Sequence, residues 1–153
     1  MSEIDTNPGE TAAGTAPPIP AGFAVMDPFG PFHELVGPIY ETRRKGLVVT
    51  GMRASVKHRN KGPIVHGGML LALADTAMVR VAIDLRPADT ICVTSSLSSE
   101  LLSAARPGDW LEAEVEVLRR GRRLIALNCM IRRDGPDGEL VMRASAIFQI
   151  LAG

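Results

Sequence analysis

Several features that mark particular classes of protein are scarce or missing in this sequence. Aromatic residues make up only 4% of the chain, too few for the stacking surfaces that bind single-stranded nucleic acid. Lysine plus arginine and aspartate plus glutamate number 17 each, so the basic excess typical of nucleic-acid binders is missing. The longest apolar run, residues 69–85, is interrupted by Asp75, Arg80 and Asp84, which argues against a membrane span. The sequence therefore predicts neither a nucleic acid nor a membrane as partner.

Cysteine is also scarce, and no secretory signal is visible. Cys92 and Cys129 lie outside any CxxC motif or His/Cys cluster, so we expect two buried free thiols, as in the reducing cytoplasm. Residues 1–22 are rich in Pro, Gly and Thr and have neither a basic n-region nor an apolar h-region. We therefore expect a disordered N-terminal tail over 1–22, a single domain over 23–153 and a cytoplasmic location.

The remaining chain has enough apolar residues for a core, and its pattern predicts an α+β fold. Hydrophobic residues make up 46% of the 153 residues, which is the size of one ordinary domain. Periodicity and turn signals predict helices over 30–37 and 67–85. Strands are expected within 38–46 and over 47–56, 90–102, 110–118, 124–133 and 140–151. One long helix among many strands indicates a helix that covers one face of an antiparallel sheet.

Alternation along two strands predicts which side chains face the core. In the strand over 110–118, apolar residues alternate with three glutamates, so one face should be buried and the other wet. The strand after the long helix is unusually rich in hydroxyls. Strict alternation places Thr94, Ser96 and Ser98 on one face, and Ser95 and Ser99 on the other. One hydroxyl is a candidate to orient a water or hold a carboxylate; a polar edge strand explains the pattern equally.

The predicted helix over 67–85 is apolar around nearly its whole circumference. Such a helix has to be buried on every side. In a chain this short, the economical arrangement is a sheet that curls around the helix. A partner subunit is then expected to cover whatever the sheet leaves open.

The helix opens with His66, Gly67 and Gly68, a combination suited to binding an anion. A helix N-terminus presents unpaired N–H groups and a partial positive charge, and glycines let a ligand approach the backbone closely. The helix start is therefore a candidate site for an anion or a developing oxyanion. The Asn60 amide is a candidate second donor. Alternatively, the glycines serve packing, and His66 caps the helix or lies in the core.

Asp75 lies in the middle of the same apolar helix, where a carboxylate is expected to have either a polar partner or a catalytic role. It is a candidate general base or nucleophile, or else a structural carboxylate paired with Arg80 or a hydroxyl. Arg80 lies on a somewhat different face, so we do not expect that pair. Gly67 and Asp75 are about 12 Å apart along the helix, too far to act on one carbonyl. If they cooperate, two antiparallel helices related by a two-fold axis must join them, which predicts a homodimer with shared sites.

These residues resemble a known family. The stretch NKGPIVHGGMLLALAD, with Asn60, Gly62, the His-Gly-Gly sequence and Asp75, resembles the hotdog-fold acyl-CoA thioesterases of the phenylacetate-pathway (PaaI-like) type. The stretch RPGDWLEAEVEVLRRGRRL over 106–124 extends the similarity, which covers about residues 30–151. The resemblance implies a hotdog fold, in which a curved antiparallel sheet wraps a long helix. It also implies dimers, commonly paired into tetramers.

The resemblance further implies a hydrolytic site shared between two subunits. The Gly67 N–H polarises the thioester carbonyl, helped by Asn60, and Asp75 of the other subunit activates water or attacks directly. Thr94 stands where the family often has a Ser or Thr that assists the water. His66 has an optional catalytic role, or only shapes the turn into the helix. The products are a free acid and coenzyme A, and neither a metal nor a redox cofactor is implied.

Coenzyme A carries phosphates, so basic residues are expected near the mouth of the pocket. The sequence offers the clusters KHRNK over 57–61 and RRGRR over 119–123. Arg59 and Arg122 are the candidate phosphate ligands, because arginine suits phosphate, and Gly68 is a further candidate substrate contact. Solvated turns explain both clusters equally.

Two other functions remain open at this point. A hotdog module that binds acyl-CoA without hydrolysis predicts binding that survives the loss of Asp75. An acyl hydratase or dehydratase on the same fold typically uses an Asp and a His in another arrangement than His66 and Asp75. The apolar helix residues suggest an apolar acyl group. They do not separate a phenylacetyl from a medium-chain fatty acyl group, nor a dimer from a tetramer.

Overall fold

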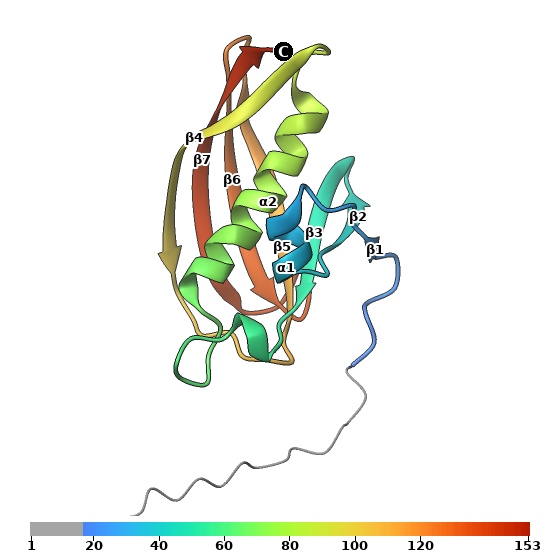
Figure 1. The fold of residues 1–153 in the computed structure, drawn as a ribbon, viewed down its shortest axis with the longest axis vertical. Coiled ribbons are helices and arrows are strands. Elements are labelled where there is room, and N and C mark those ends of the chain that lie inside the picture. Colours follow the sequence, from blue (N-terminus) through green and yellow to red (C-terminus); the bar gives the residue numbers. More distant parts are fainter. Residues whose placement is uncertain (1–16) are drawn as a thin grey trace, which may run out of the picture.

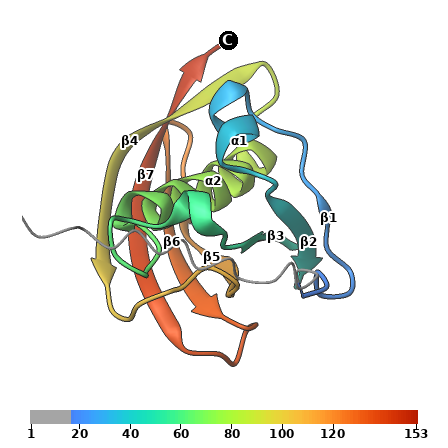
Figure 2. The same ribbon diagram turned by 60° about the horizontal axis from the view of Figure 1, so that its bottom comes forward.

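The computed structural model describes residues 17–153, in which a long helix packs against a curved antiparallel sheet (Figure 1). The helices are α1 (Pro31–Val36) and α2 (Gly67–Leu85), with a 3₁₀ turn, η1, at Val56–His58. The strands are β1 (Ala24–Val25), β2 (Tyr40–Arg44), β3 (Leu47–Arg53), β4 (Thr90–Leu101), β5 (Trp110–Arg120), β6 (Leu124–Arg133) and β7 (Leu140–Ala152). Seven strands follow the order β1-β2-β3-β5-β6-β7-β4 and curve around α2 (Figure 2). The predicted α+β fold is confirmed.

The long helix α2 begins and ends where the sequence predicts, at Gly67 and Leu85. His66 caps its start, because an imidazole nitrogen accepts a backbone N–H of the first turn. At the other end, Pro87 disfavours helical geometry at Arg86, whose ψ of 153° is extended. Local signals thus set both ends of the helix. Among residues 17–153, no helix combines the length and the apolar character that a membrane crossing requires.

Part of the N-terminal segment lies along the sheet. Of the tail expected over 1–22, residues 1–16 lie outside the described residues. In the described part, Arg53 donates a hydrogen bond to the Pro18 carbonyl at 2.7 Å. The Phe23 ring then meets the Trp110 ring edge-on, with 5.0 Å between their centroids. This segment therefore covers the face of β3 and β5 that points away from α2.

That cover corrects the predicted wet face of β5. Glu112 was expected in water but is buried, with only 2% of its surface exposed. One of its carboxylate oxygens accepts the Trp110 indole N–H at 2.9 Å, and the other accepts from the Arg44 guanidinium at 2.6 Å. The residues that bury Glu112 come from β2 and the N-terminal segment, so alternation along β5 alone did not reveal them. The inward face is as predicted, with Leu111, Ala113 and Val115 buried.

A β-bulge in the edge strand β4 corrects the predicted hydroxyl faces. Thr94 lies opposite Phe148 on β7, and Ser96 lies opposite the next residue, Ile147, so β4 carries one extra residue at Ser95. Neighbouring residues of β7 point to opposite faces of the sheet. Thr94 therefore shares the inner face with Phe148, which faces the core, whereas Ser96 points to the outer face. Strict alternation failed here because a bulge reverses the pattern beyond it.

Both cysteines are free thiols, as predicted. Cys129 on β6 is buried, and its burial raises the pKa of the thiol to about 12. Cys92 on the edge strand β4 is only partly buried, which departs from the expectation of two buried thiols. An edge strand has a neighbour on one side alone, so its side chains are less covered.

Candidate active site

The first turn of α2 leaves one backbone donor without an acceptor among residues 17–153. The His66 carbonyl accepts the N–H groups of Met69 and Leu70, at 2.9 and 3.3 Å. The His66 Nδ1 atom accepts the Gly68 N–H at 2.8 Å. The Gly67 N–H is the donor that remains, at the positive end of a 19-residue helix. Capping, one of the two interpretations of His66, is therefore what the structure shows.

The two glycines allow close contacts around that donor. A Cβ atom on Gly67 would lie 2.9 Å from the Cδ1 atom of Leu101 on β4. A Cβ atom on Gly68 would lie 3.0 Å from the His66 Nδ1 atom, which caps the helix. These close contacts support the packing interpretation of the glycines, and access of a ligand to the backbone stays a prediction.

A mostly apolar groove of about 470 Å³ lies beside the start of α2. Its lining comes from α1, from the loop before α2 and from the first turns of α2: Phe32, Leu35, Val36, Lys57, His58, Arg59, His66, Gly68, Met69 and Ala72. Figure 2 shows α1 beside α2, and the α1 residues of this lining form one wall of the groove. The apolar residues form its body, and Lys57 and Arg59 add positive charge. The site therefore combines an apolar cavity with cations and a helix N-terminus.

Polar bonds rather than burial hold α1 in place. None of its six residues is buried. At its C-terminal end, the Leu35 carbonyl accepts from Lys57 Nζ at 3.0 Å, and the Val36 carbonyl accepts from His58 Nε2 at 2.6 Å. In its middle, His33 Nε2 lies 3.0 Å from the Thr76 hydroxyl of α2. These bonds fix the wall of the groove relative to α2.

Burial lowers the pKa of both histidines that hold α1. For His58, burial is the main cause of the lowered pKa. The hydrogen bond to the Val36 carbonyl raises the pKa in part, and the nearby Lys57 charge lowers it further. For His33, burial again dominates, and the Asp75 carboxylate raises the pKa only in part. Both imidazoles are therefore neutral near pH 7. His33 keeps its proton on Nε2, because its Nδ1 accepts the Phe29 N–H at 3.0 Å.

Asp75 is positioned by a hydroxyl and lacks a cation. Its Oδ1 atom accepts the Thr94 hydroxyl of β4 at 2.8 Å. Arg80 instead binds Glu41 at 3.0 Å and Asp84 at 2.6 Å, so the absence of an Asp75–Arg80 pair was predicted correctly. Among residues 17–153, no cationic side chain lies within ion-pair distance of Asp75. The carboxylate therefore keeps a second oxygen free of hydrogen bonds to these residues.

The outer stripe of α2 stays partly open in a single chain. Leu71, Ala72, Asp75 and Val79 are only partly buried, and they recur at helical spacing along one side. The sheet and α1 do not cover this stripe, so burial on every side is not reached within one chain. Asp75 lies in the middle of the stripe, about 12 Å along the axis from Gly67. One chain therefore does not bring these two groups to a common point.

The remaining predicted site residues differ in how close they lie to the start of α2. Asn60 lies in the loop before α2, where its Oδ1 atom accepts the Gly62 N–H at 2.7 Å and its own N–H binds the Ile64 carbonyl. No hydrogen bond joins it to Gly67 among the described residues. Arg59 lines the groove, as the phosphate interpretation expects. Arg122 lies in the β5–β6 hairpin, beside the end of the sheet where β4 begins, opposite to the start of α2.

Sequence reasoning missed the contribution of α1. Phe32 and Leu35 are three residues apart on this short helix and are largely exposed, at 56% and 73%. Exposed apolar residues at helical spacing are a usable signal of a binding wall. His33 gave no such signal, because its partner Thr76 is 43 residues away.

Comparisons with known proteins identify the family to which this chain belongs. The profile described as "Thioesterase superfamily" matches residues 62–139. The Pseudomonas aeruginosa protein named "Putative esterase" is 32% identical over 135 residues, which cover 86% of this chain and 97% of that protein. The chain therefore belongs to the thioesterase superfamily and is a thioester hydrolase.

Solved structures support the same fold. The E. coli PaaI protein from the phenylacetic acid degradation operon aligns with a TM-score of 0.70 at 22% identity, covering 80% of this chain and 85% of that one. A Bacillus halodurans protein solved with CoA aligns with a TM-score of 0.67 at 24% identity, over 74% of each chain. The resemblance to PaaI-like hotdog proteins is thus confirmed at the level of the fold.

Proposed function

We propose that the protein hydrolyses the thioester of coenzyme A with a medium-sized apolar acyl or aryl group. The observation that carries the proposal is the unpaired Gly67 N–H at the start of α2, beside an apolar groove, on a helix that also carries Asp75. A structurally similar protein was solved with CoA, which supports this choice of thiol. The groove of about 470 Å³ is lined mainly by apolar side chains, which favours an uncharged acyl group.

The Gly67 N–H would bind the thioester carbonyl oxygen. As water adds to the carbonyl carbon, negative charge develops on this oxygen, and the N–H together with the positive end of α2 stabilises it. Asn60 is the proposed second donor, through its side-chain NH₂, because its Oδ1 atom is already bonded to the loop. His66 contributes by holding the first turn open at Gly67.

Asp75 would supply the base. Thr94 binds Oδ1, and the other oxygen takes a proton from water as the water oxygen bonds to the carbonyl carbon. The tetrahedral intermediate then breaks its C–S bond, the thiolate takes up a proton, and the free acid leaves. A direct attack by Asp75 through an anhydride gives the same products. A single turnover in H₂¹⁸O tests for the second route, because an unlabelled acid together with ¹⁸O in Asp75 arises only when water opens the anhydride at the Asp75 carbonyl.

The two halves of the site would come from two subunits. Gly67 and Asp75 are too far apart on one helix, and the stripe of α2 through Asp75 is partly open. Two copies with antiparallel α2 helices would cover the stripe and place Asp75 of each chain near the Gly67 of the other. The site is therefore proposed to be complete only in a homodimer, with a dimer of dimers as a further step.

The test is thiol release from a panel of acyl- and aryl-CoA thioesters by the wild type and Asp75→Asn. We expect kcat to fall about 10²- to 10⁴-fold in the variant, because a general base contributes that much, while CoA binding persists. Asp84→Asn is the matched control: it makes the same change on the same helix, at a carboxylate paired with Arg43 and Arg80, and should retain activity. Binding without turnover in every protein would instead support a non-catalytic acyl-CoA-binding module.

A further inference from the structure

Several cations at the loop that leads into α2 have no carboxylate partner among residues 17–153. Residues 57–68 include three basic side chains and no carboxylate. Within this loop, Arg59 pairs with Val65 in an antiparallel bridge. The Val65 N–H in turn donates to the Ala105 carbonyl at 2.8 Å. The backbones at 59, 65 and 105 therefore run side by side, which places the backbones of Arg59 and of Ala105, the residue before Arg106, on either side of Val65, roughly 10 Å apart.

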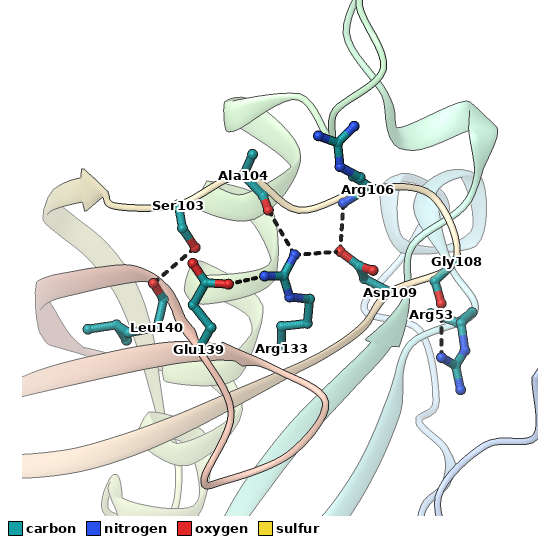
Figure 3. Close-up of polar contacts among 9 residues, drawn as sticks. All are labelled: Arg53, Ser103, Ala104, Arg106, Gly108, Asp109, Arg133, Glu139 and Leu140. Carbon is teal, nitrogen blue, oxygen red and sulfur yellow. Dashed lines mark hydrogen bonds and ion pairs between the residues drawn. The ribbon is translucent and has the colours of Figure 1, made fainter.

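Arg106 differs from its arginine neighbours in having no partner. Arg133 binds Asp109 at 3.5 Å and also pairs with Glu139, and Arg53 donates to the Gly108 carbonyl at 3.0 Å. Only the backbone of Arg106 is bonded: its N–H donates to Asp109 Oδ2 at 2.8 Å, and its carbonyl accepts the Asp109 N–H at 3.1 Å. Figure 3 shows its guanidinium pointing away from the Arg133 cluster, towards the loop before α2. Among residues 17–153, no carboxylate and no carbonyl is bonded to this guanidinium.

The other two cations at this end are equally free. The side chains of Arg59 and Lys61 are exposed, and within the described part of the chain neither forms an ion pair or a hydrogen bond. The chain has as many carboxylates as cations, so a general shortage of partners does not explain this. Three like charges at one end of the sheet repel one another, and an anion would relieve that repulsion.

The geometry points to a phosphate-binding site formed by Arg59, Lys61 and Arg106, which holds the phosphate groups at the far end of the thioester substrate. This inference rests on the proposed function, in which coenzyme A is the thiol. Arg59 connects the two regions, because it both lines the acyl groove and belongs to the cluster. The two arginines offer planar N–H forks suited to phosphate oxygens. Arg122, at the opposite end of the sheet, is not part of this cluster.

The experiment compares Arg106→Gln with the wild type on two thioesters of the same acyl group. One is the acyl-CoA, and the other is the acyl-pantetheine, which lacks every phosphate. We expect KM for the acyl-CoA to rise roughly tenfold, the loss typical of a charged hydrogen bond, with kcat nearly unchanged. KM for the acyl-pantetheine should stay the same. Dephospho-CoA thioesters show whether the 3′-phosphate or the diphosphate carries the effect.

Two further variants sharpen the result. Arg106→Lys keeps the charge without the fork, so it should recover part of the affinity for acyl-CoA. Arg43→Gln removes an exposed arginine that is paired with Asp84 and should leave both KM values unchanged. An equal rise of KM for both thioesters with Arg106→Gln, or no rise for either, would overturn the phosphate site.

A binding measurement separates this inference from the proposed function. Calorimetry with free CoA and free pantetheine needs no turnover. If the wild type hydrolyses no thioester but Arg106→Gln still weakens CoA binding selectively, the phosphate site stands and the proposed hydrolysis fails. If turnover occurs and Arg106→Gln changes neither binding nor KM, the hydrolysis stands and the phosphate site fails.

Discussion

The charged side chains around the two ends of α2 differ in whether they form ion pairs. Around the C-terminal half, Arg80 binds Glu41 and Asp84, and Asp84 also binds Arg43 at 2.7 Å. Around the N-terminal end, the cations of the loop and Arg106 have no carboxylate partner among the described residues, and the Gly67 N–H has no acceptor. A net charge of zero conceals this separation.

This difference indicates that one end of α2 stabilises the fold, whereas the other end is available for a ligand. The paired end fastens α2 to β2, through Glu41 and Arg43, and its charged groups are engaged in ion pairs. The unpaired end leaves a donor, several cations and an apolar groove available. Asp75 lies between the ends, and it has a hydroxyl partner but no cation. Breaking each end separately should therefore affect different properties.

The largest expected effect is on activity, from removing the Gly67 N–H. Gly67→Pro deletes this donor, and proline is well tolerated at the first position of a helix. The residue before it, His66, already has φ and ψ of −63° and 133°, which suit a following proline. We expect kcat to fall about 10²- to 10³-fold, as when one oxyanion donor is lost. Thiol release measures it.

Gly67→Ala is the matched control, because it adds a similar Cβ contact with Leu101 but keeps the N–H. Equal losses in both variants would assign the effect to packing. Mixing Gly67→Pro with Asp75→Asn subunits extends the test. If sites are shared, mixed dimers contain one intact site, and about a quarter of wild-type activity should return. No recovery would place the whole site in one chain.

The next effect is on stability, from breaking the paired end. Arg80→Met keeps an unbranched apolar stem and removes the bonds to Glu41 and Asp84. We expect the free energy of unfolding to fall by about 1 kcal/mol, since partly exposed ion pairs contribute little each. Urea denaturation measures this, and kcat should not change. A large loss of activity in a folded Arg80→Met variant would contradict the assignment of stability to the paired end and of activity to the other end.

The smallest effect is a pH dependence from the histidines that hold α1. Burial lowers the pKa of His33 and His58 in the folded state. Below the ordinary histidine pKa of 6.5, the unfolded chain therefore binds more protons than the folded chain. Stability should therefore decrease as the pH falls below 6.5. His33→Gln should flatten this slope in urea denaturation series. Stability that rises on acidification over this range would refute the assignment.

Much of the fold was predictable because its signals are local. The bounds of α2 follow from a capping histidine, an apolar run and Pro87, all within about 20 residues. The inward face of β5 follows from alternation, and Cys129 is buried as expected. The hydroxyl faces of β4 were not predictable, because the bulge at Ser95 is defined only by the pairing of β4 with β7.

The residues of the candidate site on α2 were predictable from the sequence, whereas the contributions of neighbouring segments were not. His66, Gly67 and Asp75 stand out because their residue types are unusual at their places on an apolar helix. The contribution of α1 and the free state of Arg106 depend on contacts with distant segments. Arg122 and Arg106 look alike in the sequence, as arginines beside turns. Only the packing of the 104–106 segment on Val65 distinguishes them.

The sequence by itself determined the long helix, its cap, the carboxylate on its open face and the strands that wrap it. Each of these depends on periodicity or on residues close together in the chain. The tertiary structure alone decided which charges are neutralised, because ion pairs such as Arg80–Glu41 join residues 39 positions apart. Coulomb energy depends on distance in space, and distance in space is set by the fold as a whole.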